Sequence, residues 1–360
     1  MTAGRDRRLA ALRASLATGS HDAMLITSLP NIRYLSGFSG SSALLVVSAN
    51  DAVLLTDFRY TEQAKEQAGD VMRVVIEPAS LWSRLWAVLP TLNVEVMAFE
   101  SAHVTHADYQ RFVDSGSRWQ WRPSLNLVET LREQKDATEI GHIRDAVRMA
   151  ESALARTIAR VKVGMTEMQI GGTLEWELRE AGSEAFAFET IVATGFRSAL
   201  PHARCSSRQL QMNEFLLIDF GAVSGGYVSD ITRTFVMGKA TPEMKDVYDV
   251  VRESNATASG AVRAGMRGKD ADALARGYIE RRGWGDEFGH SLGHGIGLEI
   301  HESPRLSKSS DAPLPVGSVV TIEPGIYRPK WGGVRIEDDV WLNSDAAVVL
   351  TSFARELIEL

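Results

Sequence analysis

Four acidic residues and one histidine, each in a short apolar or glycine-punctuated stretch, constrain this chain more than any other feature. In chain order they are Asp219, Asp230, His294, Glu323 and Glu337. Such surroundings predict burial, and a buried charge is costly unless it pairs with another charge or a metal ion. Carboxylates that converge on one pocket would repel one another and retain protons unless cations neutralise them. Two divalent cations balance four carboxylates, so the sequence predicts a two-metal site and therefore an enzyme.

The local patterns indicate how these residues could meet. Asp219 ends the apolar run FLLI and Asp230 follows GGYVS, with a turn predicted at Gly225–Gly226 between two strands. The hairpin would bring the two aspartates together. Arg335 lies two residues before Glu337, and residues two apart on a strand share a face. Oxygen ligands with a single imidazole suit Mn²⁺, Co²⁺ or Zn²⁺ better than copper or iron–sulfur chemistry.

Composition limits the class of protein. A length of 360 residues favours two domains, and 44% hydrophobic with 24% charged residues is typical of a soluble globular protein. The net charge of −7 argues against general nucleic-acid binding, which needs a basic face. The single cysteine, Cys205, excludes an intramolecular disulfide. Because no apolar run has the length of a signal peptide or membrane span, we expect no membrane partner and a cytoplasmic location.

The predicted domains are residues 1–128 and 129–360. In the first, an amphipathic helix is predicted over 5–18 and another helix over 81–89. The short apolar runs AMLIT, SALLVVS, AVLLTD, VMRVVI and VEVMAFE predict strands. Strands that alternate with helices favour a small α/β domain.

The second domain should be α+β, with helices packed on a sheet that carries the chemistry. Pro123 is expected to interrupt regular structure near the boundary. Asp136 followed by Glu139 predicts a capped helix start, with an apolar stripe that continues to Ile158. Three more helices are predicted, over 166–181, from Pro242 onward and over 270–282.

The histidines near the candidate ligands could suggest a helical zinc site. His290 and His294 are four residues apart, as in the HExxH helix of zinc proteases. The surrounding glycines disfavour a helix, and no glutamate follows His290, so this reading fails. His202 and His301 also flank the acidic cluster in sequence and are candidates to orient substrate or move protons.

The segment 289–293 matches G-x-S-x-G, the nucleophile elbow of serine hydrolases. That motif needs a strand before the serine and a helix after it, and neither is predicted here. The order serine, acid, histidine also fails, because only Glu299 separates the segment from the last histidine, His301. We therefore reject a serine-hydrolase function.

With these residues placed, the chain resembles the pita-bread metallopeptidases, the family of prolidase, aminopeptidase P, methionine aminopeptidase and creatinase. The resemblance runs from about residue 135 to the end, through IDFG, SDITRTF, GHGIGLEIHE, EPGIY and VRIEDD. NIRYLSGFSGS and TDFRY are similar to the creatinase-like N-terminal domain of Xaa-Pro peptidases. Methionine aminopeptidase lacks that domain, and creatinase lacks the complete metal set. The resemblance thus implies an Xaa-Pro peptidase with a pita-bread catalytic domain.

The resemblance also implies roles for individual residues. Asp219 would chelate the second metal, Asp230 and Glu337 would bridge both ions, and His294 and Glu323 would complete the shell of the first. A hydroxide that bridges the ions would attack the carbonyl of the bond before proline, with Mn²⁺ or Co²⁺ favoured and Zn²⁺ as an alternative. A homodimer is expected on the same ground.

Further residues match family positions around the metals. His202 and His301 would hold substrate and stabilise the tetrahedral intermediate, and Glu323 is the candidate proton shuttle. Positions close to the substrate or behind the ligands are matched by His290, Tyr327 and Arg335. The family wording before SALPH contains Gly-His or Gly-Glu-Asn, whereas this chain has Gly-Phe-Arg at 195–197. That difference leaves the rim of the pocket undefined.

Substrate length is the finer question. The bond before proline is a tertiary amide without an N–H, so a pocket shaped for the ring is needed, with Phe186 and Phe188 as candidate walls. A dipeptidase must also bind the free proline carboxylate, which arginine does well, and Arg305 falls where short microbial prolidases carry such a residue. We expect Xaa-Pro dipeptides as substrates. Aminopeptidase P activity on longer peptides is the alternative, and a non-catalytic pita-bread binding protein is the remote one.

Overall fold

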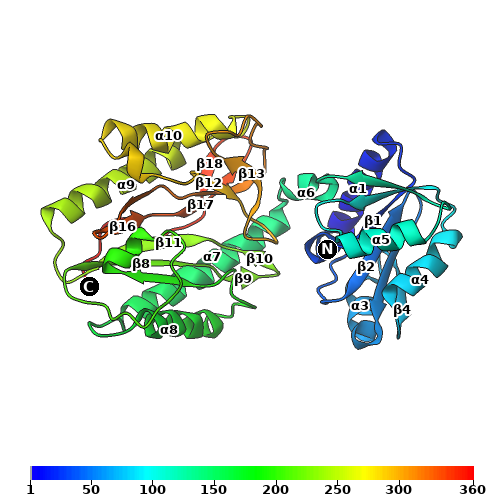
Figure 1. Ribbon diagram of the computed structural model, residues 1–360, viewed down its shortest axis with the longest axis horizontal. Helices are drawn as coiled ribbons and strands as arrows, with labels where there is room; N and C mark the ends of the chain where they lie inside the picture. Colours follow the sequence, from blue (N-terminus) through cyan, green and yellow to red (C-terminus); the bar gives the residue numbers. More distant parts are fainter. Residues whose placement is uncertain (1) are drawn as a thin grey trace. The chain divides into compact units, whose positions relative to one another are not determined.

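The computed structural model describes residues 2–360, which divide between Arg132 and Glu133 into two compact units (Figure 1). The sequence places the domain boundary between residues 128 and 129. Each unit combines sheets with helices and has hydrophobic core clusters of its own. The predicted fold class, a small α/β unit followed by a larger unit of helices on antiparallel sheets, is confirmed.

The first unit is built on one six-stranded mixed sheet. Its strands are β1 (Ala23–Ile26), β2 (Ala43–Ser48), β3 (Ala52–Asp57), β4 (Arg73–Glu77), β5 (Val96–Glu100) and β6 (Gln120–Ser124). They lie in the order β4-β3-β2-β1-β5-β6, antiparallel from β3 to β1 and parallel elsewhere. Its helices are α1 (Thr2–Thr18), α2 (Leu29–Ser36), η1 (Phe58–Tyr60), α3 (Thr61–Ala68), α4 (Leu81–Val88), η2 (Leu89–Thr91), α5 (His106–Asp114) and α6 (Leu127–Arg132).

The five apolar runs of the first unit form the five strands expected of them, β1 to β5. The prediction that Pro123 interrupts regular structure is wrong, because Pro123 pairs with Phe99 inside β6. β6 is the last strand of the sheet, and an edge strand tolerates proline because one of its sides makes no ladder hydrogen bonds.

The motifs NIRYLSGFSGS and TDFRY of the first unit lie side by side. The first covers α2 from its third residue and the loop after it, and the second ends β3 and forms η1. The Tyr60 hydroxyl is 2.7 Å from Ser41 Oγ, and the Tyr60 ring lies edge-on to Phe38 with centroids 5.5 Å apart. Gly37 ends α2 in the left-handed conformation, with φ of 82°. The two motifs therefore form one local structure.

The second unit contains four long helices and two larger antiparallel sheets. The helices are α7 (Ala137–Ile158), α8 (Glu167–Glu180), η3 (Gly195–Ala199), α9 (Pro242–Ala261), α10 (Gly268–Arg281) and η4 (Gly285–Glu287). The strands are β7 (Ile191–Thr194), β8 (Glu214–Phe220), β9 (Val223–Ser224), β10 (Tyr227–Val228), β11 (Ile231–Met237), β12 (Gly293–Gly295), β13 (Glu302–Leu306), β14 (Val319–Ile322), β15 (Gly325–Arg328), β16 (Gly332–Arg335), β17 (Asp338–Leu342) and β18 (Ala347–Val349).

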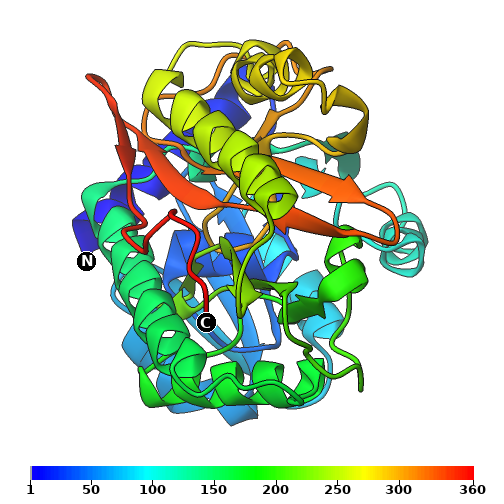
Figure 2. The same cartoon turned by 90° about the vertical axis from the view of Figure 1, so that its left-hand side faces the viewer.

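The second unit is organised as two halves, each a helix pair on a sheet. The pair α7 and α8 covers the sheet β11-β8-β7, and α9 and α10 cover the sheet β13-β12-β14-β17-β18. Figure 1 shows the strands between the two helix pairs, and Figure 2 shows the same layers after a 90° turn. The two core clusters follow the same division, one under each helix pair. The sheets of the two halves thus face each other.

The helix ends of the second unit follow from local chemistry. Asp136 forms the predicted capping box with Glu139 at the start of α7. Pro242 is the first residue of α9, where its missing N–H costs nothing. Gly182, two residues after α8, has φ of 96°, a conformation that favours glycine. Among residues 2–360, no helix combines the length and apolarity needed to cross a membrane.

Candidate active site

The five candidate metal ligands come from both halves of the second unit. Asp219 lies in β8, Asp230 directly precedes β11, His294 is the middle residue of β12, Glu323 directly follows β14, and Glu337 directly precedes β17. β8 and β11 belong to one sheet, and the other three strands belong to the second sheet. The Glu337 N–H donates to the Thr232 carbonyl of β11, 3.1 Å away, and joins the halves beside the site.

Strand alternation explains why Asp219 faces the second half. Leu216, Ile218 and Phe220 of β8 belong to the core under α7 and α8. Side chains at odd positions point to the opposite face of the strand. Phe215 joins the core under α9 and α10, and Asp219 has the same parity. The apolar run FLLI therefore buries this carboxylate on the face between the two sheets.

Glycines on both sides of His294 let β12 approach its neighbours. A Cβ atom on Gly293 would lie 2.0 Å from the Thr321 carbonyl oxygen, and one on Gly295 would lie 2.2 Å from that of Ser303. Both distances are far below van der Waals contact, so a larger residue would push the strand away. The motif G-H-G thus carries the imidazole into the space between the sheets.

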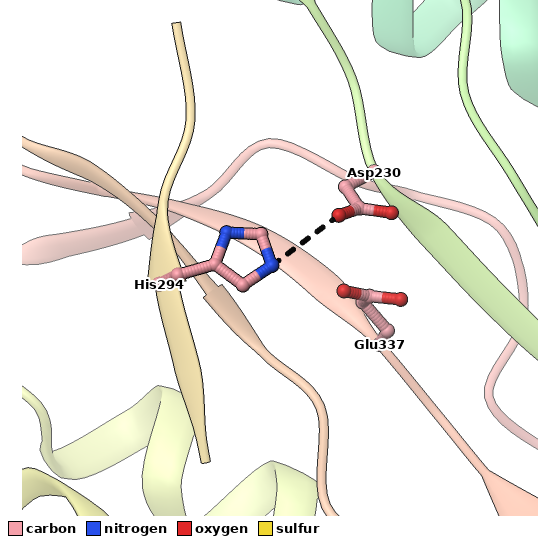
Figure 3. Close-up of side chains that lie close together, drawn as sticks. All are labelled: Asp230, His294 and Glu337. Atoms are coloured by element: carbon pink, nitrogen blue, oxygen red, sulfur yellow. Dashed lines mark ion pairs between the residues drawn. The ribbon is translucent and has the colours of Figure 1, made fainter. Parts of the chain in front are cut away.

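Three of the five residues already lie at ligand spacing. One ligand atom each from Asp230, His294 and Glu337 lies within 4.8 Å of the others (Figure 3). His294 Nε2 is 3.6 Å from Asp230 Oδ2 and 3.5 Å from Glu323 Oε1. These separations are too long for hydrogen bonds but suit donors that share a cation, since ligand bonds of about 2 Å meet at one ion.

The acidic cluster holds protons more tightly than ordinary carboxylates. Burial, with repulsion from Glu337 and Asp219, raises the pKa of Asp230 well above its usual value. Burial and repulsion from Glu323 do the same to the pKa of Glu337. Burial, together with repulsion from the Asp219 carboxylate, raises the pKa of Glu323 to about 8. The protein's own cations do not balance this cluster, and external cations would lower all three pKa values.

Asp219 is the acid that pairs with an arginine of the protein, and one of its oxygens is unpartnered. Arg335 Nη2 donates to Asp219 Oδ2 at 2.5 Å. Asp219 Oδ1 is buried and accepts no hydrogen bond, an arrangement that costs free energy unless another group reaches the oxygen. A divalent cation between Asp219 and Asp230 would satisfy this oxygen. The residues present therefore fit a metal centre.

His294 is oriented to offer a lone pair. Its Nδ1 lies 3.1 Å from the Gly295 carbonyl oxygen, so Nδ1 carries the proton and Nε2 faces the acids without one. Burial lowers the pKa of His294 to about 3, so the ring is neutral at physiological pH. Neutral imidazole is the form that binds metal ions.

A hydrogen-bonded network supports the ligands from behind. Arg335 Nε donates to Thr232 Oγ1 at 3.0 Å, and Thr232 Oγ1 donates to Glu337 Oε2 at 2.6 Å. Arg335 Nη1 donates to the Tyr327 hydroxyl at 2.9 Å, and that oxygen lies 2.9 Å from His290 Nε2. One guanidinium thus connects ligand positions with the tyrosine and histidine that the sequence proposed as their neighbours.

A cavity of about 490 Å³ opens above the five residues. Its walls also include the histidines and arginines proposed from the sequence, His202, His290, His301, Arg305 and Arg335. Burial, with the nearby Arg305, lowers the pKa of His301, and burial lowers that of His290 to about 4. The structure therefore brings five acid and imidazole ligand candidates and three further histidines to one cavity.

Two expectations about the walls need adjustment. Phe188 lines the cavity, but Phe186 is not among its lining residues and lies beneath the Arg179 guanidinium, 4.9 Å from ring centroid to Cζ. Tyr327 does not line the cavity either, and contacts it only through His290 and Arg335. A sequence motif does not determine on which side of a cavity wall an aromatic ring lies.

Three residues at or beside the cavity, Glu189, Arg204 and Thr232, were not among those selected from the sequence. Glu189 and Arg204 form an exposed ion pair on the wall, 3.4 Å apart. Thr232 links Arg335 to Glu337, as described above, and could have been found because it lies two residues after Asp230 on the same strand face. Arg204 lies on a loop, where no regular spacing predicts the direction of a side chain.

The two rejected hydrolase patterns are absent from the structure. His294 lies on a strand, so the helical zinc pair does not form. Ser291 lines the cavity, but it follows η4 and precedes β12, without the strand-to-helix turn of a nucleophile elbow.

Two facing helix-on-sheet halves, with an acidic cluster and one neutral histidine between them, define a hydrolase of the metal-dependent pita-bread class. The chain belongs to metallopeptidase family M24, whose model matches residues 141–344. Residues 8–134 match the Creatinase/Prolidase N-terminal domain. The resemblance inferred from the sequence is therefore confirmed for both units.

Similar proteins cover nearly the whole chain. An Xaa-Pro dipeptidase of Pyrococcus furiosus is 34% identical over 98% of this chain and 99% of its own length. The structure of an Xaa-Pro dipeptidase from Bacillus anthracis matches with a TM-score of 0.96 and 36% identity, over 99% of this chain and 100% of that one. The structure of an X-Pro aminopeptidase from Thermotoga maritima matches with a TM-score of 0.91 and 36% identity, over 98% and 99%.

Proposed function

We propose that the protein is a metal-dependent dipeptidase that hydrolyses the bond before proline in Xaa-Pro dipeptides. The observation that supports this most directly is the acidic cluster at the cavity, in which three carboxylates are buried and that of Glu323 is partly buried. Among residues 2–360, Arg335 is the one arginine or lysine that pairs directly with the cluster. Two divalent ions would offset that charge, and we propose Mn²⁺ or Co²⁺, bound by the five residues in the roles given above. The similarity to two Xaa-Pro dipeptidases supports this substrate class.

When bound, the ions would supply a nucleophile at neutral pH and a Lewis acid for the peptide carbonyl. The protein's side chains hold and complete that chemistry. His202 and His301 face the cavity, and a neutral His301 can donate its N–H to the oxygen that becomes negative during attack. Glu323 would carry a proton from the attacking water to the proline nitrogen that leaves.

The cavity walls fit a proline ring without a backbone donor. The apolar side chains of Phe188, Ile191 and Ile300 all line the cavity. Because the Xaa-Pro bond has no N–H, recognition must come from the shape of such walls rather than from a hydrogen bond to the scissile amide. A cyclic side chain would bury its carbons there.

Arg305 supports the choice of a dipeptide. It lies in β13, and its exposed side chain lines the cavity together with that of His301. A guanidinium there can form two parallel hydrogen bonds with a free carboxylate. Once metal ions offset the four acids, the cavity would carry the charges of Arg305, Arg204 and Arg335 against that of Glu189 alone. The excess positive charge favours an anionic substrate end.

The test compares substrates with and without the proline carboxylate. We expect the Mn²⁺-loaded protein to hydrolyse Ala-Pro faster than Ala-Pro-amide or Ala-Pro-Ala. In the Arg305→Gln variant, KM for Ala-Pro should rise about 10- to 100-fold, since a charge-assisted hydrogen bond contributes about 1.5–3 kcal/mol. Hydrolysis of Ala-Pro-amide should change little, which makes it the matched control.

Aminopeptidase activity on longer peptides is the second candidate, favoured by the similarity to the X-Pro aminopeptidase. Faster release of alanine from Ala-Pro-Ala than from Ala-Pro would decide for it. Elemental analysis of the purified protein tests the metal content, with about two equivalents of transition metal expected. The homodimer and the cytoplasmic location stay predictions, and the mass in solution tests the first.

A further inference from the structure

His202 lies on a loop between β7 and β8 rather than in either strand. The loop begins at Gly195 with η3 and reaches Ser206, and His202 and Arg204 are its exposed residues in the cavity wall. The position of the imidazole therefore depends on what holds the loop. At the cavity side, the Pro201 carbonyl accepts a hydrogen bond from Arg335 Nη1 at 3.3 Å.

The ends of this loop meet at one carboxylate outside the cavity. Glu167, the first residue of α8, has a side chain with 0% exposure. Its Oε1 accepts from the Thr194 N–H at 2.8 Å and from Thr194 Oγ1 at 3.0 Å. Its Oε2 accepts from the Ser206 N–H at 3.0 Å and from Ser206 Oγ at 2.6 Å. Residues before and after His202 are thus tied to the same group.

Arg197 completes the connection across the loop. Its Nε lies 3.1 Å and 3.0 Å from the two carboxylate oxygens of Glu167. Its Nη2 donates to the carbonyl of Arg204 at 2.7 Å. Arg197 therefore spans from the buried carboxylate to the segment that carries His202.

We propose that Glu167 and Arg197 are positioning residues that hold His202 in place for the reaction. This pair of residues, called the clasp below, ties together the two ends of the loop 195–206. The inference rests on the proposed function, in which His202 contacts the substrate. Neither clasp residue is among those that line the cavity. Their effect on catalysis would therefore run through the loop and the imidazole on it.

The chemistry of the clasp requires these two side chains. Every donor around Glu167 points at an oxygen, so a glutamine there would turn an NH₂ group toward one loop end and leave buried donors unpaired. Arg197 uses different nitrogens for Glu167 and for the Arg204 carbonyl, which a lysine ammonium cannot reproduce in the same fork. A small shift of a positioned catalytic group costs up to about 100-fold in rate.

A matched control lies on the same helix. Glu177 of α8 has a side chain with 3% exposure and pairs with Arg160 at 2.8 Å, and also with Arg156. Neither Glu177 nor Arg160 lines the cavity. Within residues 2–360, the hydrogen bonds and ion pairs of the Glu177 side chain go to Arg156 and Arg160, which lie outside the loop of His202. Glu177→Gln therefore repeats the loss of a buried carboxylate on α8 without touching the loop.

The experiment is a double-mutant cycle on the Mn²⁺-loaded full chain with Ala-Pro as substrate. We expect Glu167→Gln and Arg197→Ala each to lower kcat about 10- to 100-fold, with a smaller change in KM and unchanged metal content. In a His202→Ala background, the same substitutions should lower kcat less than about twofold, because coupled residues are not additive. Glu177→Gln and Arg160→Ala should leave kcat within about twofold in both backgrounds.

Full additivity of the clasp substitutions with His202→Ala would overturn the inference, and so would a His202→Ala variant with unchanged kcat. If Glu167→Gln does not fold, the cycle with Arg197→Ala decides alone, since that side chain is partly exposed. A wild-type protein that cleaves neither Ala-Pro nor Ala-Pro-Ala would instead remove the proposed function. The two failures are therefore distinguishable.

Discussion

Glu337 and Asp338 are consecutive residues, and their carboxyl groups have opposite surroundings. Both are buried, and because they lie next to each other at the start of β17, they point to opposite faces. Glu337 faces the cavity, where burial and other carboxylates raise its pKa well above the usual value. Burial alone would raise the pKa of Asp338 too, but Arg233 and Arg355 together lower it.

On the other face, the protein's own side chains balance the charge of Asp338. Arg233 Nη2 donates to Asp338 Oδ1 at 2.8 Å, and Arg355 Nε donates to Oδ2 at 2.7 Å. Thr351 Oγ1 adds a third donor at 2.5 Å. Arg233 also donates to four main-chain carbonyls, among them that of Glu337 at 2.6 Å. The Asp338 carboxylate and both arginines thus have protein partners of opposite charge.

On the cavity face, the carboxylate of Glu337 has no such balancing charge from an arginine. Two arginines, Arg233 of β11 and Arg355 after β18, pair with Asp338. The direct side-chain donor to Glu337 is the neutral Thr232 hydroxyl. The carboxylates of two consecutive residues thus differ: Asp338 is paired with arginines, and Glu337 at the cavity is not. A cluster of poorly paired acids is costly for stability, and cations from outside the chain would offset that cost.

The largest expected effect comes from Glu337→Gln, which removes one charge from the unbalanced face. We expect kcat/KM for Ala-Pro to fall about 10³-fold, because the bound ions supply several kcal/mol of transition-state stabilisation. The metal content should fall below two equivalents, as measured by elemental analysis. A variant with full turnover and two equivalents of metal would show that Glu337 is not a ligand.

The candidate ligands could be selected from the sequence because their signals are local. Asp219, Asp230 and Glu337 each adjoin or lie within an apolar strand sequence, and two glycines mark the strand of His294. The Asp136–Glu139 capping box is local for the same reason. These patterns depend on residues within a few positions of one another, so they do not require knowledge of the chain path.

The supporting contacts could not be predicted because they join distant segments. Asp338 and Arg233 are separated by 105 residues in sequence, and Glu167 and Ser206 by 39. A buried ion pair is set by where two strands meet, and many arginines were equally plausible partners. Period-2 alternation did contain part of the answer, since it places Thr232 and Arg233 on opposite faces of β11. It does not reveal what lies opposite each face.

The second prediction uses Asp338→Asn, the same chemical change one residue further on. An amide turns a donor toward one arginine and leaves a buried cation without its counter-charge, which costs about 3 kcal/mol of unfolding free energy. The low end of the usual range applies because Arg233 keeps its four carbonyl partners. Urea unfolding of the metal-free proteins measures the change.

Glu337→Gln is the control for that measurement. It relieves repulsion among unpaired acids, so the metal-free variant should unfold at the same urea concentration as the wild type or a higher one. Equal destabilisation by both substitutions would break the contrast between the two faces, since it would mean that Glu337 is as well paired as Asp338.

The smallest effect concerns pH and metal binding. The pKa of Glu323 in the folded, metal-free protein is about 8, above its value of about 4.5 in the unfolded chain. Its contribution to the stability of the metal-free protein is therefore fully present below pH 4.5 and is lost as the pH rises through 8.

Metal ions must displace that proton, so they bind more weakly at lower pH. The stabilisation by a fixed Mn²⁺ concentration should be about 2 kcal/mol smaller at pH 6.5 than at pH 8, at about 1.4 kcal/mol per proton and pH unit. Urea unfolding with and without Mn²⁺ at the two pH values measures the difference, and Glu323→Gln should reduce it. An equal effect of Mn²⁺ at both pH values would show that the cavity acids are already ionised without metal, as Asp338 is on the opposite face.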